Sequence, residues 1–251
     1  MIENINELEE LRRNAYVDAI YAKMDENNIV GVFSDDSDLL LFSYGFFPMP
    51  IVGVDPYIFE YSEDNDLCDP LNSTITYLKT QKCPLIFSSR FFVVDNYCPK
   101  FKEELRENTS RDLVDASKLE NYLKENFKES FDSERSILVS KKLKEIDSLL
   151  EKIELTDISG SHLFKLRFYT RFIKDLDDRI SLLENILKDH KFLGKKRKPI
   201  RVACPFAVAD QIGKKEAEYI KIEKSDQPFY SYENCIYQGQ KFITYKEILN
   251  G

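Results

Sequence analysis

A short apolar run, residues 29–33, restricts the fold of this chain more than any other feature. It is rich in β-branched side chains and is bounded by turn-forming residues, Asn27 and Asn28 before it and Ser34 after it. Such a run is typical of a strand that is covered on both faces, as strands of parallel sheets are. We therefore expect residues 29–33 to form a strand inside an α/β fold.

Segments with helical and strand patterns alternate around this run. Residues 5 to about 26 predict a helix that buries Leu8, Leu11, Ala15, Ile20 and Met24 on one face. A second helix is predicted over residues 39–44, and Gly45 ends it. Further strands are predicted in residues 46–54, which Pro48 and Pro50 interrupt, in residues 84–88 and in residues 91–94. This alternation predicts βαβ units and a Rossmann-like, mostly parallel sheet.

The second half of the chain has a different pattern. Between residues 117 and 190, leucine, lysine and glutamate dominate, and apolar residues recur at helical spacing. These apolar positions are Leu143, Ile146, Leu149, Leu150, Ile153, Ile180, Leu183, Ile186 and Leu187. A basic linker at residues 194–199 then precedes two runs that resemble strands, residues 200–204 and 218–222. We predict a helical middle segment followed by a second α/β unit.

These patterns divide the chain into three parts. Residues 1–116 form an N-terminal α/β domain with a helical extension, residues 117–194 form the helical segment, and residues 195–251 form a partial second α/β unit. The last part is short for an independent doubly wound domain.

The charge and hydropathy of the chain exclude some partners. Among 251 residues, 44 are acidic and 36 are basic, so the net charge is −8. A negative surface repels phosphate backbones, and we expect no nucleic-acid partner. No apolar stretch approaches the roughly 20 residues that cross a bilayer, so no membrane association is expected. The charged N-terminus differs from a signal peptide, which predicts a cytoplasmic location.

Several common catalytic motifs are absent from the sequence. With eight glycines, the chain contains no glycine-rich phosphate loop of the common types, and it has no Gly-x-Ser-x-Gly elbow. Its two histidines, His162 and His190, both fall in the helical segment and outside any zinc-protease pattern. Nucleotide-binding loops, serine hydrolysis and zinc proteolysis therefore have no support in the sequence.

Cysteines carry the chemical information that remains. The chain has five: Cys68, Cys83, Cys98, Cys204 and Cys235. In a reducing compartment they are either buried thiols or ligands of a metal or cluster. Cys68 and Cys98 each follow turn-forming polar residues and precede a proline, directly or after one residue. A cysteine just past the carboxyl end of a strand lies where open α/β sheets bind ligands, and iron–sulfur clusters favour thiolates.

The order of these features resembles a known family, the D-component of the 2-hydroxyacyl-CoA dehydratases, which includes the B and C subunits of benzoyl-CoA reductase. The similarity begins with the strand at residues 29–33 and the helix-glycine-proline pattern of residues 38–48. It continues with Cys68 and Cys98, about thirty residues apart, which match the first two cluster ligands of the family. Residues 158–161 and 182–184 resemble its inter-domain region, and residues 199–223 resemble the start of its second domain.

The resemblance implies two Rossmann-like domains around a [4Fe–4S] cluster that three cysteines hold, with one iron open to substrate or solvent. It also implies a homologous partner subunit, in a hetero- or homodimer, and an activator ATPase that supplies an electron. The cluster then passes the electron to an acyl-CoA thioester, and a ketyl radical expels the hydroxyl group as water. A low-potential cluster in a dry pocket suits this lyase chemistry.

The chain also departs from the family pattern. Pro99 follows Cys98 where the family has aspartate, and Ser37 and Asp38 replace a Pro-Glu-Glu sequence. The third family ligand falls beyond the last residue of this sequence. We assign the cofactor to Cys68, Cys98 and Cys204, with Cys68 and Cys98 as the metal ligands and Cys235 as the alternative to Cys204. Cys83 has no family counterpart and is expected to be a buried structural thiol.

Three hypotheses therefore remain. In the first, the chain is an iron–sulfur protein that transfers electrons to an acyl-CoA or dehydrates it. In the second, it is a paralogue without a cluster that binds or assembles with a full-length subunit. In the third, the likeness is one of fold alone, and the chain binds an unrelated small molecule.

Overall fold

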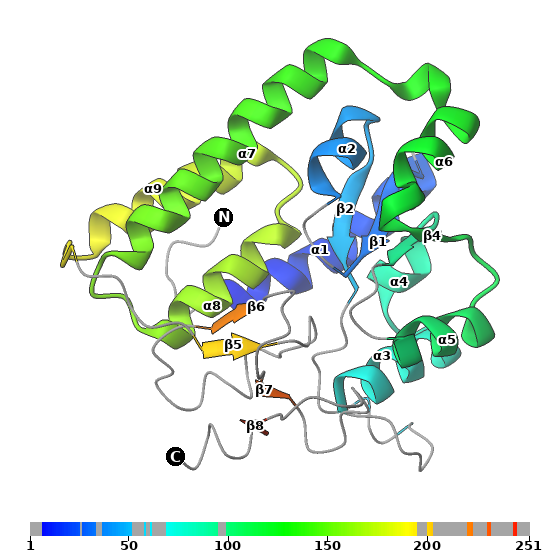
Figure 1. The fold of residues 1–251 in the computed structure, drawn as a ribbon, viewed down its shortest axis with the longest axis horizontal. Coiled ribbons are helices and arrows are strands. Elements are labelled where there is room, and N and C mark those ends of the chain that lie inside the picture. Colours follow the sequence, from blue (N-terminus) through cyan, green and yellow to red (C-terminus); the bar gives the residue numbers. More distant parts are fainter. Residues whose placement is uncertain are drawn as a thin grey trace.

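The computed structural model describes residues 7–25, 27–33, 37–51, 58, 61, 69–94 and 99–194, together with four short strands between residues 200 and 244. This part of the chain is a mixed α/β structure with a four-stranded parallel sheet (Figure 1). None of the helices in the described ranges is long and apolar enough to span a membrane.

Nine α-helices and eight strands are described. The helices are α1 (Leu8–Asp25), α2 (Asp38–Ser43), α3 (Asp69–Thr80), α4 (Pro84–Ser88), α5 (Pro99–Asn108), α6 (Leu119–Asn126), α7 (Ser133–Glu154), α8 (Gly160–Tyr169) and α9 (Leu176–Asp189). Short 3-10 turns are η3 (Ala116–Lys118), η4 (Lys128–Ser130) and η5 (Thr170–Phe172). The first sheet contains β1 (Ile29–Val32), β2 (Phe47–Pro50), β3 (Phe92–Val94) and β4 (Leu113–Asp115). The others are β5 (Ile200–Val202), β6 (Ile220–Ile222), β7 (Tyr230–Ser231) and β8 (Ile243–Thr244).

The first sheet has the strand order β2-β1-β3-β4, and all of its pairs are parallel. Its register places Gly31 beside both Met49 of β2 and Phe92 of β3. The chain starts at β1, steps to β2 on one side and then returns to β3 on the other side. The predicted parallel sheet is therefore confirmed, with β1 inside it as expected.

Strand β1 is buried on both faces, as the apolar run predicts. Ile29 belongs to one hydrophobic cluster, with α1, α3 and α4, while Val30 and Val32 belong to a second cluster with α2 and α6. Side chains of a strand alternate between its two faces, so a strand inside this sheet needs apolar residues at consecutive positions. The helices thus cover both faces of the sheet.

Strand β2 contains two prolines because it is an edge strand. The amides of Phe47 and Ile51 donate hydrogen bonds to Asn28 and Val32 on the β1 side. Pro48 and Pro50 alternate with these donors, so their missing N–H groups fall on the outer side, where the sheet has no further strand. The prolines therefore cost no hydrogen bond within the sheet, and they block pairing of another strand at this edge.

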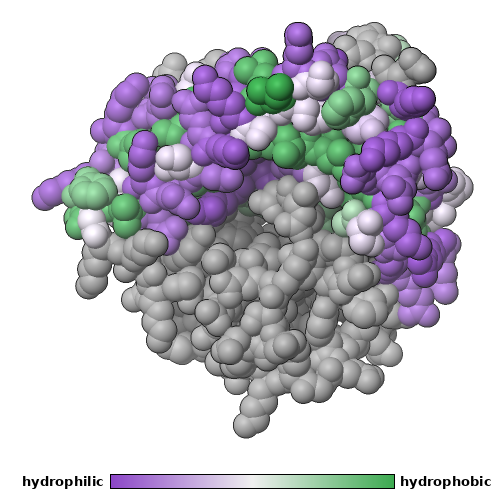
Figure 2. All heavy atoms as spheres, turned by 45° about the horizontal axis from the view of Figure 1, so that its top comes forward, coloured by the Kyte–Doolittle hydropathy of each residue, from purple (hydrophilic) through white to green (hydrophobic). Residues whose placement is uncertain are grey.

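The helical segment shares the core of the α/β part. Figure 1 shows α7 and α9 side by side, and the two helices are in contact. Ile146, Ile153 and Leu183, at predicted apolar positions, join the same hydrophobic cluster as Ile29. The face over α7 is mostly hydrophilic, with scattered apolar side chains (Figure 2). The predicted division at residue 117 is thus crossed by one continuous core.

Two predictions about local structure were wrong. Residues 84–88 form helix α4 rather than a strand, and Pro84 occupies the first turn, where its missing N–H is not needed. In α1, the buried positions are Leu8, Ala15 and Ala19, with the aliphatic stem of Arg12 among them. Ile20 and Met24, predicted to be buried, are exposed.

A second four-stranded sheet follows the helical segment. Its order is β6-β5-β7-β8, and all of its pairs are parallel. Strands β5 and β6 confirm the two strands predicted near residues 200–204 and 218–222.

The tight contact at Gly31 gives the first prediction. A Cβ at this position would lie 2.5 Å from Cδ1 of Phe92 and 2.9 Å from Cδ1 of Ile51. We expect Gly31→Ala to lower the free energy of unfolding by about 1–3 kcal/mol, because the buried neighbours must move. Urea denaturation measures the change. Phe92→Leu should relieve part of it, so the double variant should lose less stability than the sum of the single variants; additive losses would contradict the packing argument.

Candidate functional site

The order of the first sheet defines an edge where a ligand is expected. Neighbours β1 and β3 connect to helices that pack on opposite faces, so their connections diverge at the carboxyl ends of the two strands. Open α/β sheets bind ligands in the crevice that such a divergence creates. By this rule a ligand is expected beyond Val32 of β1 and Val94 of β3.

The predicted ligands Cys68, Cys98, Cys204 and the alternative Cys235 lie outside the described residues. The described elements next to two of them are nevertheless informative. Helix α3 begins at Asp69 and helix α5 begins at Pro99, so each begins one residue after a predicted ligand. The two helices pack against each other and lie side by side in Figure 1. Both belong to connections that return the chain from the carboxyl ends of strands to the next amino end.

Cys83 is buried and forms no disulfide. It directly precedes helix α4, where its backbone is extended. Its carbonyl oxygen accepts a hydrogen bond from the amide of Phe87. The expectation of a buried structural thiol is confirmed.

An ion pair that the sequence patterns did not predict lies at the carboxyl end of β1. The Arg171 guanidinium, on η5, is 3.1 Å from Oδ1 of Asp38, in the first turn of α2. The two side chains are only 12% and 8% exposed. The pair joins η5 of the helical segment to the start of α2, the helix that follows β1. The two residues are 133 positions apart, and no local pattern links them.

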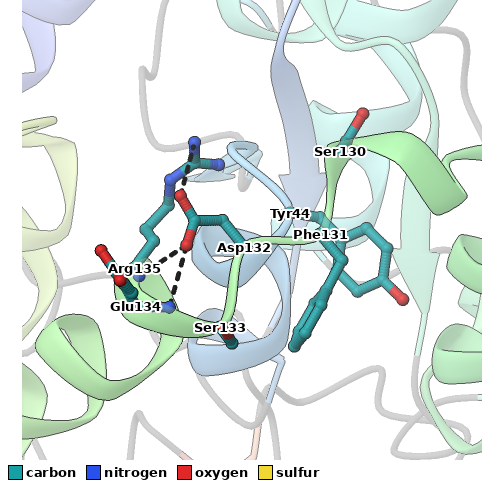
Figure 3. A pocket seen from close by; sticks show the side chains of 7 residues that line it. All are labelled: Tyr44, Ser130, Phe131, Asp132, Ser133, Glu134 and Arg135. Atoms are coloured by element: carbon teal, nitrogen blue, oxygen red, sulfur yellow. Dashed lines mark hydrogen bonds and ion pairs between the residues drawn. The ribbon is translucent and has the colours of Figure 1, made fainter.

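A second feature of the structure is an open hollow of about 660 Å³. The rings of Tyr44 and Phe131 line one side, and their centres are 5.2 Å apart (Figure 3). On the other side, Oδ1 of Asp132 accepts hydrogen bonds from the amides of Glu134 and Arg135 at the start of α7. These bonds lower the pKa of Asp132. Because Asp132 caps the helix, its N-terminus has little capacity for another anion.

The position of this hollow also argues against a ligand site. Tyr44 follows α2, which returns the chain to the amino end of β2, so the hollow lies away from the carboxyl edge. We therefore assign it a structural role, the capping of α7.

The two histidines are not at the carboxyl edge either. Nδ1 of His190 is 3.1 Å from Oδ1 of Asp157, and this bond lowers the pKa of Asp157. Burial and the charge of nearby Lys165 lower the pKa of His162. Backbone bonds from Leu193 and Gly194 to the carbonyl of Leu155 fasten the same region. These contacts hold the end of α9 against the α7–α8 connection, which is a structural function.

Within the described ranges, no three His, Cys, Asp or Glu side chains come close enough to hold a metal ion. Comparison with models of protein families and with curated proteins finds no match for this chain. The resemblance to the dehydratase family and the iron–sulfur site therefore stay predictions.

The Asp38–Arg171 pair gives a second prediction. Removing one partner of a buried pair leaves an unpaired buried charge, which costs about 3–5 kcal/mol. We expect Arg171→Met to lower the free energy of unfolding by nearly that amount, and the double variant Asp38→Leu/Arg171→Met to recover most of the loss. Urea denaturation measures both. Lys124→Met, which breaks an exposed pair with Glu120, is the control and should leave stability unchanged. Equal losses in the single and double variants would contradict a specific ion pair.

Proposed function

We propose that this chain is an iron–sulfur protein similar to a subunit of the 2-hydroxyacyl-CoA dehydratases, which transfers electrons to an acyl-CoA or dehydrates it. The observation that carries the proposal is the packing of α3 against α5, because these helices begin directly after Cys68 and Cys98. On this proposal the two cysteines lie near each other at the carboxyl edge of the sheet, where both helices begin.

The donor set fits an iron–sulfur cluster. Cluster irons favour thiolates, and a helix N-terminus stabilises a thiolate through its unpaired N–H groups and its dipole. Cys68 and Cys98 would each place a thiolate at the start of a helix, and Cys204 or Cys235 would complete the set. When bound, such a cluster supplies an electron at low potential. The remaining task of the protein is to orient the acceptor and exclude water.

The strand order supports the fold that this proposal requires. The order β2-β1-β3-β4 is the order found in flavodoxin-like, doubly wound sheets. The second sheet repeats it as β6-β5-β7-β8. Two Rossmann-like units in one chain are the arrangement that the family resemblance implies. On this proposal a homologous subunit, an activator ATPase and an acyl-CoA are the partners.

Anaerobic purification tests the cluster. We expect brown protein that contains iron and acid-labile sulfide, and we expect Cys68→Ala and Cys98→Ala to lose both because each removes a ligand. Visible absorption and iron analysis give the readout. Cys83→Ala, which changes the buried structural thiol, is the control and should keep its iron. A colourless wild-type chain that gains no iron on anaerobic reconstitution would falsify the proposal.

A second candidate function, assembly with a homologous subunit without a cluster, has one observation in its favour. Helix α1 exposes four large apolar side chains one or two turns apart: Val17, Ile20, Tyr21 and Met24 are 55%, 45%, 63% and 77% exposed. They lie at helical spacing and form one apolar stripe. An apolar stripe of this kind often marks a surface that another protein covers.

Co-purification separates this candidate from the first. A tagged chain should capture a longer homologous subunit, and Tyr21→Ser with Met24→Ser should weaken that capture. Ile137→Ser is the matched control, because Ile137 is 73% exposed on α7, outside the stripe. Mass spectrometry identifies the captured chain. Equal capture by the stripe variant and the control would eliminate α1 as the assembly surface.

A further inference from the structure

The apolar stripe on the outer face of α1 has a defined spacing. Val17, Ile20, Tyr21 and Met24 lie at positions i, i+3, i+4 and i+7, so they occupy two consecutive turns of one face, and all four are exposed. The opposite face of the helix packs against α4 and α8. Single exposed apolar residues are common on protein surfaces, whereas a contiguous set of large ones marks a surface that another molecule covers.

Phe87, which lies beside α1 at the end of α4, enlarges this apolar surface. It is 42% exposed, and Nζ of Lys23 lies 3.6 Å from the centre of its ring. Lys23 also donates to the carbonyl oxygen of Phe87, so its charge is directed onto α4 and not across the stripe. Side chains of this size have about 150–250 Å² of surface each, and the exposed parts of the five apolar side chains therefore amount to roughly 500 Å².

The charges that border the stripe leave its centre apolar. Arg13, one turn before Val17, forms an ion pair with Glu10. Asp18 is exposed beside the stripe. The chain as a whole has a net charge of −8. An acidic chain with an acidic residue at this border repels an anionic membrane, so the stripe suits a protein partner better than a lipid surface.

We propose that the stripe is the contact surface of a homodimer, in which a second copy of this chain covers it. Two copies bury about 1,000 Å² in total, which is the lower limit for a specific interface, so the dimer is weak and depends on concentration. A polar covering surface would lose its hydration without compensation, whereas the same stripe on a second copy is apolar and equal in size. The inference does not depend on the iron–sulfur function.

The spacing of the stripe suits a two-fold axis. When two copies of α1 pack antiparallel with the axis between residues 20 and 21, Val17 lies level with Met24 of the second copy, and Ile20 lies level with Tyr21. Each level then combines a β-branched side chain with a longer one, which is the alternation of sizes that interdigitating side chains need. An isologous contact uses the same surface on both subunits, so it closes at two copies and forms no filament.

Analytical ultracentrifugation of the full chain across micromolar concentrations tests the dimer. We expect a reversible equilibrium that shifts toward the dimer as salt is added, because salt screens the repulsion between two acidic copies. Tyr21→Ser with Met24→Ser should raise the dissociation constant about tenfold or more, since both side chains leave the apolar contact. Ile137→Ser, on α7 outside the stripe, is the control and should leave the constant unchanged. Circular dichroism confirms that each variant is folded.

Hydrogen exchange locates the contact in the unchanged chain, because backbone amides of residues 17–24 should exchange more slowly at high than at low concentration. A chain that stays monomeric at every concentration contradicts the proposal, and so does a dimer that the stripe variant and the control form equally well. Capture of a longer subunit through the stripe, by a chain that is monomeric on its own, assigns the surface to that subunit and also contradicts it. None of these readouts involves iron, so their outcome is separate from that of the cluster experiment.

Discussion

The structure depends on the burial of strand β1 on both of its faces. Ile29 and Phe33 face one hydrophobic cluster, and Val30 and Val32 face the other, so this strand links the helices above and below the sheet. The one residue of β1 without a side chain is Gly31. The ring of Phe92 and the end of the Ile51 side chain lie too close to it for a Cβ. Strands on either side of β1 take their register from it. The position of the carboxyl edge of the sheet follows from this strand.

The helical segment is fixed to that edge by more than apolar contact. Apolar packing between α7, α9 and the α/β part is tolerant of small shifts, whereas the pair between Arg171 and Asp38 specifies one geometry. Desolvation of two charges offsets much of their attraction, so a buried pair contributes little net stability. Its effect is on orientation, because moving η5 away from α2 would separate the two charges. The pair thus defines where η5 meets the start of α2.

The sequence predicted the features that depend on local pattern. The two-sided burial of residues 29–33, the end of α2 shortly before Gly45 and the apolar face of α7 follow from periodicity and from turn residues. Gly45 has a φ of 79°, a conformation that favours glycine. Residues 84–88 were predicted wrongly because a short apolar run suits a strand and a buried helix equally well, and the deciding residue is Pro84 at the helix start.

Other features could not be predicted because distant parts of the chain create them. The face of α1 is set by what α4 and α8 leave open, so Ala19 is buried while Met24 is exposed. Arg171 becomes important only where the fold brings it to Asp38. For the candidate site, the sequence alone selected Cys68 and Cys98, because each follows turn-forming residues. The order of the strands in each sheet depends on contacts between distant segments, which no local pattern contains.

The two edges of the first sheet differ in electrostatics, and this difference favours the carboxyl edge as the site of a negatively charged group. At the other edge, the C-terminus of α4 presents backbone carbonyls, and cations already satisfy them. Nζ of Lys23 donates to the carbonyl of Phe87, and the Arg111 guanidinium donates to Ile86 and Phe87. Burial lowers the pKa of both cations, and the nearby charge of Arg111 adds to the effect on Lys23.

The carboxyl edge has the opposite polarity. The helices of parallel crossovers begin there, and their N-termini carry unpaired N–H groups with a partial positive charge. Thiolates bound to iron remain negative, so a cluster site needs such donors near it. Helices α3 and α5 begin directly after Cys68 and Cys98 in the sequence. A negatively charged group at this edge would therefore meet favourable helix dipoles.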